Sequence, residues 1–300
     1  KNLALAIIDE QHRFGVAQRL ALKNKGQDVH QLMMSATPIP RTLAMSFFAD
    51  LDVSVIDELP PNRTPIKTRL VNSLRRTQVE SFVLSTCQKG QQAYWVCPLI
   101  EESETLQLQT AVDTQLELQQ ALPDLSIGLV HGRMKSADKA AVMAEFSAGR
   151  IDVLVATTVI EVGVDVPNAS LMVIEHAERM GLAQLHQLRG RVGRGAAASA
   201  CVLIFSEPLS ELSKARLKVI YEHTDGFEIA RQDLNIRGPG EFLGARQSGV
   251  PMLRFANLEE DLPLLEAARD VAPRLIKERM DIVNIHLQRW LASRESYLGV

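Results

Sequence analysis

The chain has 300 residues, of which 46% are hydrophobic and 23% are charged, and its formal net charge is −3. This composition is typical of a globular protein with room for about two domains, and it excludes fibrous and low-complexity classes. Three scattered cysteines form no Cys-x-x-Cys pair, which argues against a structural zinc site and for a reducing, cytosolic compartment. No apolar run reaches membrane-spanning length. The net charge says little about nucleic acid, because such binding uses local patches.

The chain begins with Lys1 and enters a nearly continuous apolar run at residues 3–8, which is typical of a central strand covered on both faces. Because a domain seldom starts at such a strand, we expect a piece of a longer protein. Asp9 and Glu10 follow the run. Carboxylates beyond the carboxyl end of a parallel strand suit a bound Mg²⁺, held through water by Asp9, and a water molecule activated by Glu10. The pattern alone is weak, since many strands end in an acid.

A second apolar run, residues 31–34, leads into Ser35, Thr37 and two prolines that force an extended turn. The two hydroxyls either link a nucleotide site to another surface or belong to an ordinary Ser/Thr turn. We expect a helix over residues 42–48 and a short strand over 53–56. Residues 59–65 contain three prolines and predict a stiff linker.

After the linker, strand and helix patterns alternate. Strands are predicted over residues 66–71, 92–99, 126–130, 151–155, 170–174 and 200–205, and helices over 77–88, 110–122, 136–147 and 182–188. Thr77 and Glu80 predict a capping box, and Ser136 predicts a helix cap. The alternation predicts an α/β domain with a parallel sheet and right-handed crossovers.

The alternation stops at residue 208. We expect a helix over residues 210–223, a shaped glycine-rich segment over 225–249 and a helical tail over 259–293. Residues Ile276, Met280, Val283, Leu287 and Trp290 form a helical stripe that predicts a core-facing side of this tail.

Two turns in the α/β domain carry residue types that bind phosphate or ribose. Arg133 lies between a predicted strand and a predicted helix start, where a phosphate is well accommodated. Thr157 and Thr158 follow another strand, and Gly163 and Asp165 come next; the glycine permits close approach and the aspartate can accept from a ribose hydroxyl or an arginine. Each stretch alone is also compatible with a plain βα turn.

Residues 184–195 contain three arginines and three glycines without an acid. On one helical turn, Arg191 and Arg194 would leave the same face, and Gly190 and Gly193 would let a ligand approach. Two guanidinium groups aimed at one point suit a polyphosphate. The alternative is an exposed basic helix end.

In order, these motifs resemble the motor core of superfamily 2 helicases, with residues 9–12 similar to motif II, 35–37 to motif III, 156–167 to motif V and 187–194 to motif VI. Stretches 9–16, 36–42 and 181–190 resemble two related families of bacterial DNA translocases, the branched-DNA helicases and the transcription-repair coupling factors. The branched-DNA (RecG) family fits better, because residues 57–65, 94–97, 131–134 and 237–241 are similar to its version.

The resemblance implies P-loop NTPase (RecA-like) sheets. Residues 1–58 would be the C-terminal part of a first RecA-like domain, 59–65 a linker, 66–207 a second RecA-like domain, 208–256 a translocation helical hairpin with its loop, and 257–300 a C-terminal helical segment. The family's Gly-x-x-x-x-Gly-Lys-Ser/Thr loop does not occur in this sequence. We therefore expect the piece alone to lack ATPase activity.

The resemblance also implies a role for individual residues. The catalytic residues would be Glu10, Arg191 and Arg194, and the nucleotide and its Mg²⁺ would be bound by Asp9, Gly163, Asp165 and Gln187. His12, Ser35 and Thr37 would couple the nucleotide to DNA, which Arg133, Thr157 and Thr158 would contact. The translocation loop would use Arg231, Arg237, Gly238, Gly240 and Gln247; from the residues alone, its arginines either contact phosphates or pair with nearby acids.

The cofactors implied are ATP and Mg²⁺, and the partner implied is branched double-stranded DNA, such as stalled replication forks and Holliday junctions. A single-stranded-DNA-binding protein is a further partner suggested by the family. We expect a monomer in the bacterial cytoplasm, associated with the nucleoid. The alternatives are a translocase that couples transcription to repair and a non-catalytic nucleic-acid-binding module.

Overall fold

The computed structural model describes residues 3–9, 21–22, 25–26, 29–35, 54–56, 58, 65–98, 104–157, 166–195, 197–237 and 261–291. The chain divides into two compact units, one of Ile56–Gly238 and the other of Lys1–Val55 with Pro239–Val300. Among the described residues, no helix is long and apolar enough to cross a membrane.

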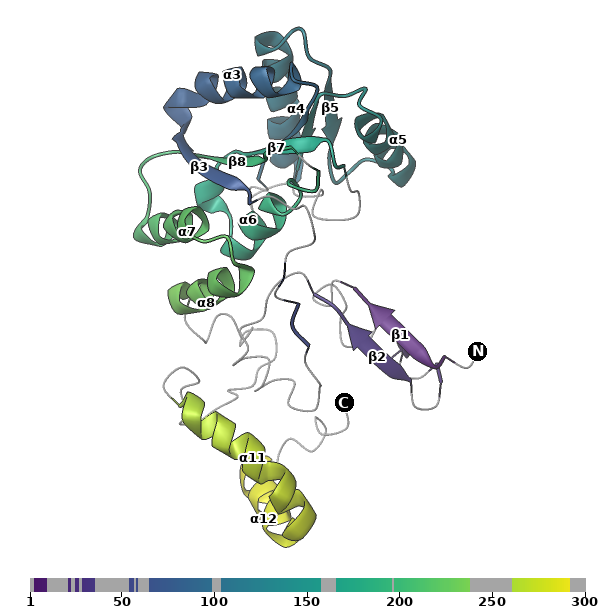
Figure 1. Ribbon diagram of the computed structural model, residues 1–300, viewed down its shortest axis with the longest axis vertical. Helices are drawn as coiled ribbons and strands as arrows, with labels where there is room; N and C mark the ends of the chain where they lie inside the picture. Colours follow the sequence, from purple (N-terminus) through teal and green to yellow (C-terminus); the bar gives the residue numbers. More distant parts are fainter. Residues whose placement is uncertain are drawn as a thin grey trace. The chain divides into compact units, whose positions relative to one another are not determined.

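The unit Ile56–Gly238 is built on a parallel sheet of six strands in the order β3-β8-β7-β4-β6-β5. Figure 1 labels β3, β8, β7 and β5 of this sheet. The strands are β3 (Lys67–Asn72), β4 (Gln92–Val96), β5 (Ile127–Val130), β6 (Val153–Ala156), β7 (Ala169–Ile174) and β8 (Ala200–Phe205). The helices are η2 (Ser73–Arg75), α3 (Arg76–Cys87), α4 (Glu104–Ala121), α5 (Ser136–Ser147), η4 (Ala177–Arg179), α6 (Leu182–Arg189), α7 (Glu211–Glu222) and α8 (Gly226–Arg237). The predicted α/β class with a parallel sheet is confirmed.

Helices cover both faces of this sheet. Because side chains alternate along each central strand, each of these strands contributes to a core cluster on either face. On one face, Tyr94 and Val96 of β4 pack in a core cluster with residues of α5, α6, α7 and α8. On the other face, Trp95 packs in a second cluster with residues of α3 and α4. All five residues of β4 are buried, as expected of a parallel strand covered on both sides.

The predicted starts of α3 and α5 lie within one residue of the observed ones, but the predicted capping residues are wrong. The capping box is wrong, because α3 starts at Arg76 directly after η2 and Thr77 lies inside the helix. Ser136 is the first residue of α5, and Lys135 occupies the cap position without a side-chain hydrogen bond. Ser210 does cap α7, since its side chain accepts a hydrogen bond from the Ser213 backbone N–H.

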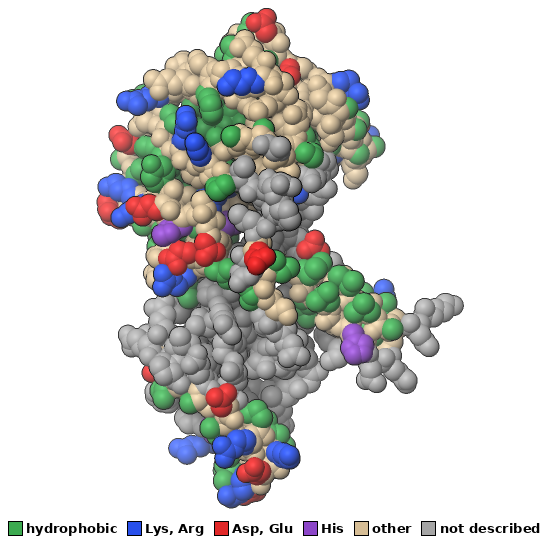
Figure 2. Space-filling view, in the orientation of Figure 1, with side chains coloured by type: hydrophobic (Ala, Val, Ile, Leu, Met, Phe, Trp, Pro, Cys, Tyr) green, Lys and Arg blue, Asp and Glu red, His purple; other side chains and the backbone are tan. Residues whose placement is uncertain are grey.

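The other unit contains two parallel strands, β1 (Leu5–Ile8) and β2 (His30–Met33). Ala6 and Ile8 are buried, whereas Leu5 and Ile7 are more than half exposed, so the expected burial of this strand on both faces is not observed. Figure 2 shows apolar side chains gathered on this small sheet. The predicted helix 42–48 lies outside the described residues, and residues 54–56 form no strand.

The tail of the same unit forms α11 (Leu262–Glu278) and α12 (Met280–Leu291), which are separated at Arg279. The helical tail predicted over 259–293 thus consists of two helices in its described part. Ile276 and Met280 of the predicted core-facing stripe are more than half exposed. The break explains part of this difference, because residues on either side of it no longer share one helical phase.

Candidate functional site

The motif VI stretch begins as helix α6. Leu182, Leu185 and Leu188 are completely buried and hold the helix against the sheet, which explains why this short segment is helical. The helix ends at Arg189, and Gly193 has a φ of 79°. The prediction that Arg191 and Arg194 share one helical turn is therefore wrong. Both lie in the loop beyond α6, where Arg191 is partly exposed and Arg194 is exposed.

The glycines of this loop permit close packing of protein against protein. A Cβ atom on Gly193 would lie 2.9 Å from Ile66 Cγ1, and one on Gly195 would lie 2.3 Å from the carbonyl oxygen of Pro167. The first contact holds the loop against the residue before β3, and the second holds it against the end of the motif V stretch. Gly193 also has the positive φ that other residues rarely adopt. The glycines thus fix the course of the chain that presents the two arginines.

Arg189, which was not among the predicted site residues, makes several side-chain hydrogen bonds. Its side chain is buried (4% exposed) and donates hydrogen bonds to Thr68 Oγ1 on β3 at 3.3 Å and to three backbone carbonyls. The carbonyls are those of Ile220 at 2.8 Å, His223 at 2.9 Å and Thr224 at 3.3 Å. They lie at the C-terminal end of α7, where the helix dipole favours a cation.

Burial lowers the pKa of Arg189 from its usual 12.5, but a guanidinium remains charged at neutral pH. Arg189 thus connects the motif VI helix to the junction between α7 and α8. The preceding His186 is also largely buried, and this burial lowers its pKa to about 4, so its imidazole is neutral. Gln187, a predicted nucleotide-binding residue, lies partly buried on the same helix.

The turn between β5 and α5 concentrates positive charge. Arg133 is exposed there, and Lys139 Nζ donates a hydrogen bond to the Gly132 carbonyl at 2.8 Å. The pKa of His131 is lowered by burial and by the charges of Lys139 and Arg133. These cations lie next to the N-terminus of α5, whose first turn also carries Asp138. Binding of a phosphate at this turn stays a prediction.

Thr157 lies beside that turn, because β5 and β6 are neighbouring strands and the Thr157 N–H donates to the Val130 carbonyl at 3.2 Å. Its buried hydroxyl has no hydrogen-bond partner among the described residues. The structure therefore brings Arg133 and Thr157, which are far apart in sequence, to the same edge of the sheet. Thr158, Gly163 and Asp165 lie outside the described residues.

In the other unit, Asp9 follows β1 and Ser35 follows β2 at the same edge of the two-stranded sheet. Ile8 is paired with Met33, and the Met34 N–H donates to the Ile8 carbonyl at 2.7 Å. Asp9 and Ser35 are both exposed. Glu10, His12 and Thr37 lie outside the described residues.

Of the predicted translocation-loop residues, Arg231 is the one whose side chain is described. Its guanidinium makes two hydrogen bonds to the Glu228 carboxylate, at 2.8 and 3.0 Å. Arg231 and Gln232 lower the pKa of Glu228 to about 2. The paired reading thus holds for this arginine. Arg237 ends α8 without a described side chain, and Gly238, Gly240 and Gln247 lie outside the described residues.

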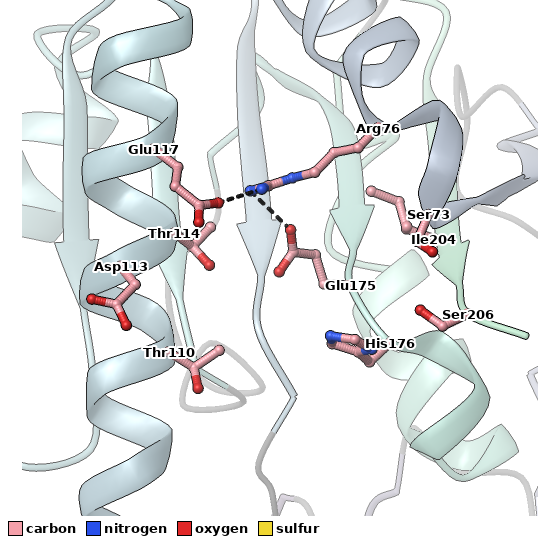
Figure 3. Close-up of a pocket in the computed structure, with 10 residues that line it drawn as sticks. All are labelled: Ser73, Arg76, Thr110, Asp113, Thr114, Glu117, Glu175, His176, Ile204 and Ser206. Atoms are coloured by element: carbon pink, nitrogen blue, oxygen red, sulfur yellow. Dashed lines mark hydrogen bonds and ion pairs between the residues drawn. The ribbon is translucent and has the colours of Figure 1, made fainter.

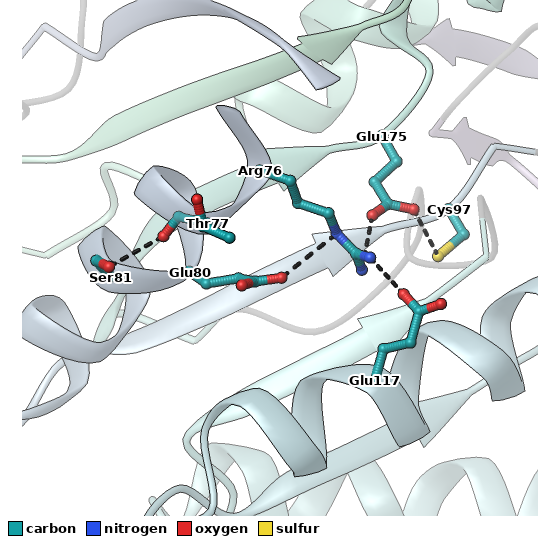
Figure 4. A network of polar contacts seen from close by, with 7 residues as sticks. All are labelled: Arg76, Thr77, Glu80, Ser81, Cys97, Glu117 and Glu175. Atoms are coloured by element: carbon teal, nitrogen blue, oxygen red, sulfur yellow. Dashed lines mark hydrogen bonds and ion pairs between the residues drawn. The ribbon is translucent and has the colours of Figure 1, made fainter. Parts of the chain in front are cut away.

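A polar cavity of about 350 Å³ lies at the carboxyl ends of β3, β7 and β8, next to α3 and α4 (Figure 3). At its edge, Arg76 Nη2 is 3.1 Å from Glu175 Oε1, Nε is 3.6 Å from Glu80 Oε1, and Nη1 contacts Glu117 (Figure 4). The guanidinium also lies 5.4 Å from the centroid of the Trp95 ring. Burial raises the pKa of Glu175, although Arg76 opposes this shift. Nothing in the local sequence patterns predicted this network.

The described residues contain no group of three or more His, Cys, Asp or Glu side chains arranged to hold a metal ion. Burial raises the pKa values of Cys87, Cys97 and Cys201 to about 12, so all three remain thiols at neutral pH. The three thiols are therefore unsuited to nucleophilic catalysis.

Two family models match the chain. One, described as the Helicase conserved C-terminal domain, matches residues 74–196, and the other, described as ATP-dependent DNA helicase RecG, domain 3, C-terminal, matches residues 223–286. The first includes Arg133 in the cationic turn between β5 and α5, Thr157, helix α6 and the loop beyond α6 that carries Arg191 and Arg194. The second begins at the end of α7.

Similar sequences cover nearly the whole chain. The chain is 57% identical over 295 residues to an ATP-dependent DNA helicase RecG of Acidithiobacillus ferridurans and 57% identical over 301 residues to that of Escherichia coli strain K12. These alignments cover 98% and 99% of this chain but 43% of each relative. The chain thus spans less than half the length of the curated relatives it matches.

Among solved structures, a RecG bound to a three-way DNA junction has a TM-score of 0.68 and 49% identity, over 89% of this chain and 34% of that one. The sequence and fold similarities agree with the motif order, and they favour the branched-DNA family over the transcription-repair coupling factors. Over nearly its whole length the chain is therefore similar to one part of the RecG family of ATP-dependent DNA helicases, of which it spans less than half.

Proposed function

We propose that the chain is the C-terminal motor portion of an ATP-dependent translocase that remodels branched double-stranded DNA during recombination and repair. One observation carries the proposal furthest: Arg189 joins the motif VI helix to the junction between α7 and α8. The nucleotide-binding loop with its two arginines is thereby connected to the helices that precede the predicted translocation loop.

ATP and Mg²⁺ are the proposed cofactors, and residue types in each of the two units support them separately. Arg191 and Arg194 lie on a fixed loop beyond α6, and Asp9 is exposed beyond β1 on the edge that also carries Ser35. ATP supplies the phosphoanhydride bond whose hydrolysis drives the motor. Asp9 would hold Mg²⁺ through water, and Glu10 would accept the proton of the attacking water. Arg191 and Arg194 would bind the charge that develops on the γ-phosphate, and Gln187, Gly163 and Asp165 would line the nucleotide.

The DNA-binding part of the proposal rests on the cationic turn. Arg133 and the N-terminus of α5 offer groups that bind phosphates, and Thr157 lies on the neighbouring strand end. Thr158 would join them, and His12, Ser35 and Thr37 would relay the state of the nucleotide. Arg237, Gly238, Gly240 and Gln247 would follow the duplex, while Arg231 would stabilise α8 through Glu228.

The finer parts of the proposal concern the cellular setting. The protein would act as a monomer in the bacterial cytoplasm near the nucleoid, with a single-stranded-DNA-binding protein as a further partner. The transcription-repair alternative has no specific observation in its favour. A non-catalytic binding module would share the fold but lack turnover, which the following experiment detects.

The test uses the complete protein, because the Gly-x-x-x-x-Gly-Lys-Ser/Thr loop does not occur in these 300 residues. Arg194→Ala should leave the binding of ATP and forked DNA intact but reduce DNA-stimulated ATP hydrolysis by about 10³-fold or more, the usual effect of losing an arginine finger. The matched control is Arg150→Ala, which removes an exposed arginine paired with Glu145.

Retained turnover in the Arg194→Ala protein would remove this residue from the catalytic role. A wild-type protein without DNA-stimulated turnover would instead favour the non-catalytic module.

A further inference from the structure

The chain leaves strand β7 through a residue in an unusual conformation. His176 has φ 46° and ψ 44°, in the left-handed region, and it is the one non-glycine residue with positive φ in the described part of the chain. Side chains with a Cβ atom disfavour this region, so such a residue persists where its surroundings determine it. The contacts on both sides of His176 therefore indicate the role of this corner, the left-handed residue at which the chain leaves β7.

On the strand side, the preceding residue is fixed by its backbone and by its side chain. The Glu175 N–H donates to the Val96 carbonyl of β4 at 2.9 Å. Its buried carboxylate lies 3.1 Å from Arg76 Nη2, at the start of α3 (Figure 4). A shift of the last position before the corner would therefore disturb both this backbone hydrogen bond and a partly buried ion pair.

On the far side, Glu178 connects the corner to two other elements. His176 Nδ1 lies 3.3 Å from Glu178 Oε1, and Glu178 Oε2 accepts a hydrogen bond from the Ser206 N–H, just after β8, at 3.3 Å. The Glu178 carbonyl accepts from Ser213 Oγ in the first turn of α7 at 2.9 Å. The corner is thus fixed to the ends of two strands and to one helix.

The segment that follows this corner is short and leads directly to motif VI. After η4 come Met180 and Gly181, and α6 starts at Leu182. The direction in which the chain leaves β7 therefore sets where α6 begins, and through α6 where the loop with Arg191 and Arg194 lies.

We infer that His176 is a positioning residue for the motif VI arginines: its left-handed corner, held by Arg76 through Glu175 and by Glu178, sets the placement of the loop that carries them. The inference rests on the proposed function of Arg191 and Arg194. His176 itself touches no reacting group and acts through the backbone.

The cavity of Figure 3 makes the inference testable by substitution. His176 lines this cavity, and its side chain is 38% exposed, so another side chain of moderate size fits without a clash. A substitution at this position therefore tests the backbone conformation more than the packing. Valine strongly disfavours the left-handed region, whereas asparagine tolerates it.

The experiment measures kcat and KM for ATP, with forked DNA present, in the complete protein carrying His176→Val or His176→Asn. His176→Val should lower kcat at least about tenfold and change KM less than about twofold. The reason is that a displaced arginine finger mainly loses its interaction with the transition state and much less its interaction with bound ATP. His176→Asn should stay within about twofold of wild type in both. The control is Glu145→Gln, which removes one partner of an exposed ion pair on α5.

Cooperative thermal unfolding shows whether each variant is folded. If His176→Val does not fold, Glu178→Ala replaces it with the same expected split between kcat and KM. A folded His176→Val protein with wild-type kcat, or a His176→Asn protein as impaired as His176→Val, overturns the inference. Arg194→Ala is measured in parallel: if it is active, the finger assignment and the positioning role both fail, and if it is inactive beside an active His176→Val, only the positioning role fails.

Discussion

His176 and Glu178 form a partly exposed pair in which each partner favours the charged form of the other. The hydrogen bond with Glu178 raises the pKa of His176 above its usual 6.5, and partial burial opposes this shift. Burial alone would raise the pKa of Glu178, but the hydrogen bonds from His176 and from backbone N–H groups hold it below its usual 4.5. The other charged groups near His176 are Glu175, Arg179 and, across the cavity, three residues of α3 and α4: Arg76, Asp113 and Glu117.

These shifts predict how the stability of the corner depends on pH. Because the folded-state pKa of His176 is raised, its contribution to stability is complete below about pH 6.5 and is lost as the pH rises through the folded value. The contribution of Glu178 is present above about pH 4.5 and is lost as the pH falls. His176→Asn should therefore lower the Tm more at pH 6 than at pH 8.5. Thermal unfolding at both values checks this, and an equal decrease at both would contradict it.

The local sequence could not have revealed His176 as a corner. Glycine and asparagine are the residue types that usually indicate a left-handed backbone conformation, and residue 176 is a histidine. Arg76 was equally hidden, because its partners Glu117 and Glu175 are 41 and 99 residues away in sequence. The roles of both residues depend on contacts between strand ends that are far apart in sequence.

At the level of elements, helix α6 shows that periodicity can predict the position of a helix but not the distant partners of its side chains. The helix predicted over residues 182–188 agrees with α6 to within one residue, and its leucines at 182, 185 and 188 form the buried side. Arg189 follows Leu185 by four positions, so it falls on the same buried stripe, and this was the available signal that its charge would be buried. Its acceptors on α7 lie more than thirty residues further along the chain, and periodicity carries no information about them.

Arg189 therefore gives a prediction about how α6 and α7 are connected. Arg189→Met should leave buried carbonyls without donors and lower the free energy of unfolding by about 3 kcal/mol. Arg189→Lys keeps the charge but cannot reach four acceptors, so it should retain ATP hydrolysis better than fork unwinding in the complete protein. Urea unfolding and paired measurements of hydrolysis and unwinding check these outcomes. Equal losses of both activities in Arg189→Lys would argue against a connecting role.

At the level of the whole molecule, the alternation of strands and helices predicted a parallel sheet but not its strand order. The order β3-β8-β7-β4-β6-β5 places the first strand of this unit next to its last, Lys67 opposite Ala200. Such pairings depend on long-range packing, which no local window contains. The order matters for function, because it puts the turn after β5 beside the end of β6 and so assembles Arg133 and Thr157 at one edge.

That edge leads to a prediction about DNA binding by the complete protein. If Arg133 contacts a phosphate, Arg133→Ala should reduce the slope of log K against log salt by about 1, because one fewer counterion is released. The loss of affinity should be the same on two forked duplexes of unrelated sequence, since phosphate contacts carry no sequence information. Arg150→Ala, at the other end of α5, is the matched control and should leave the slope unchanged. A salt titration of fork binding that gives Arg133→Ala the wild-type slope, or a loss on one sequence alone, would remove the turn from the DNA-binding surface.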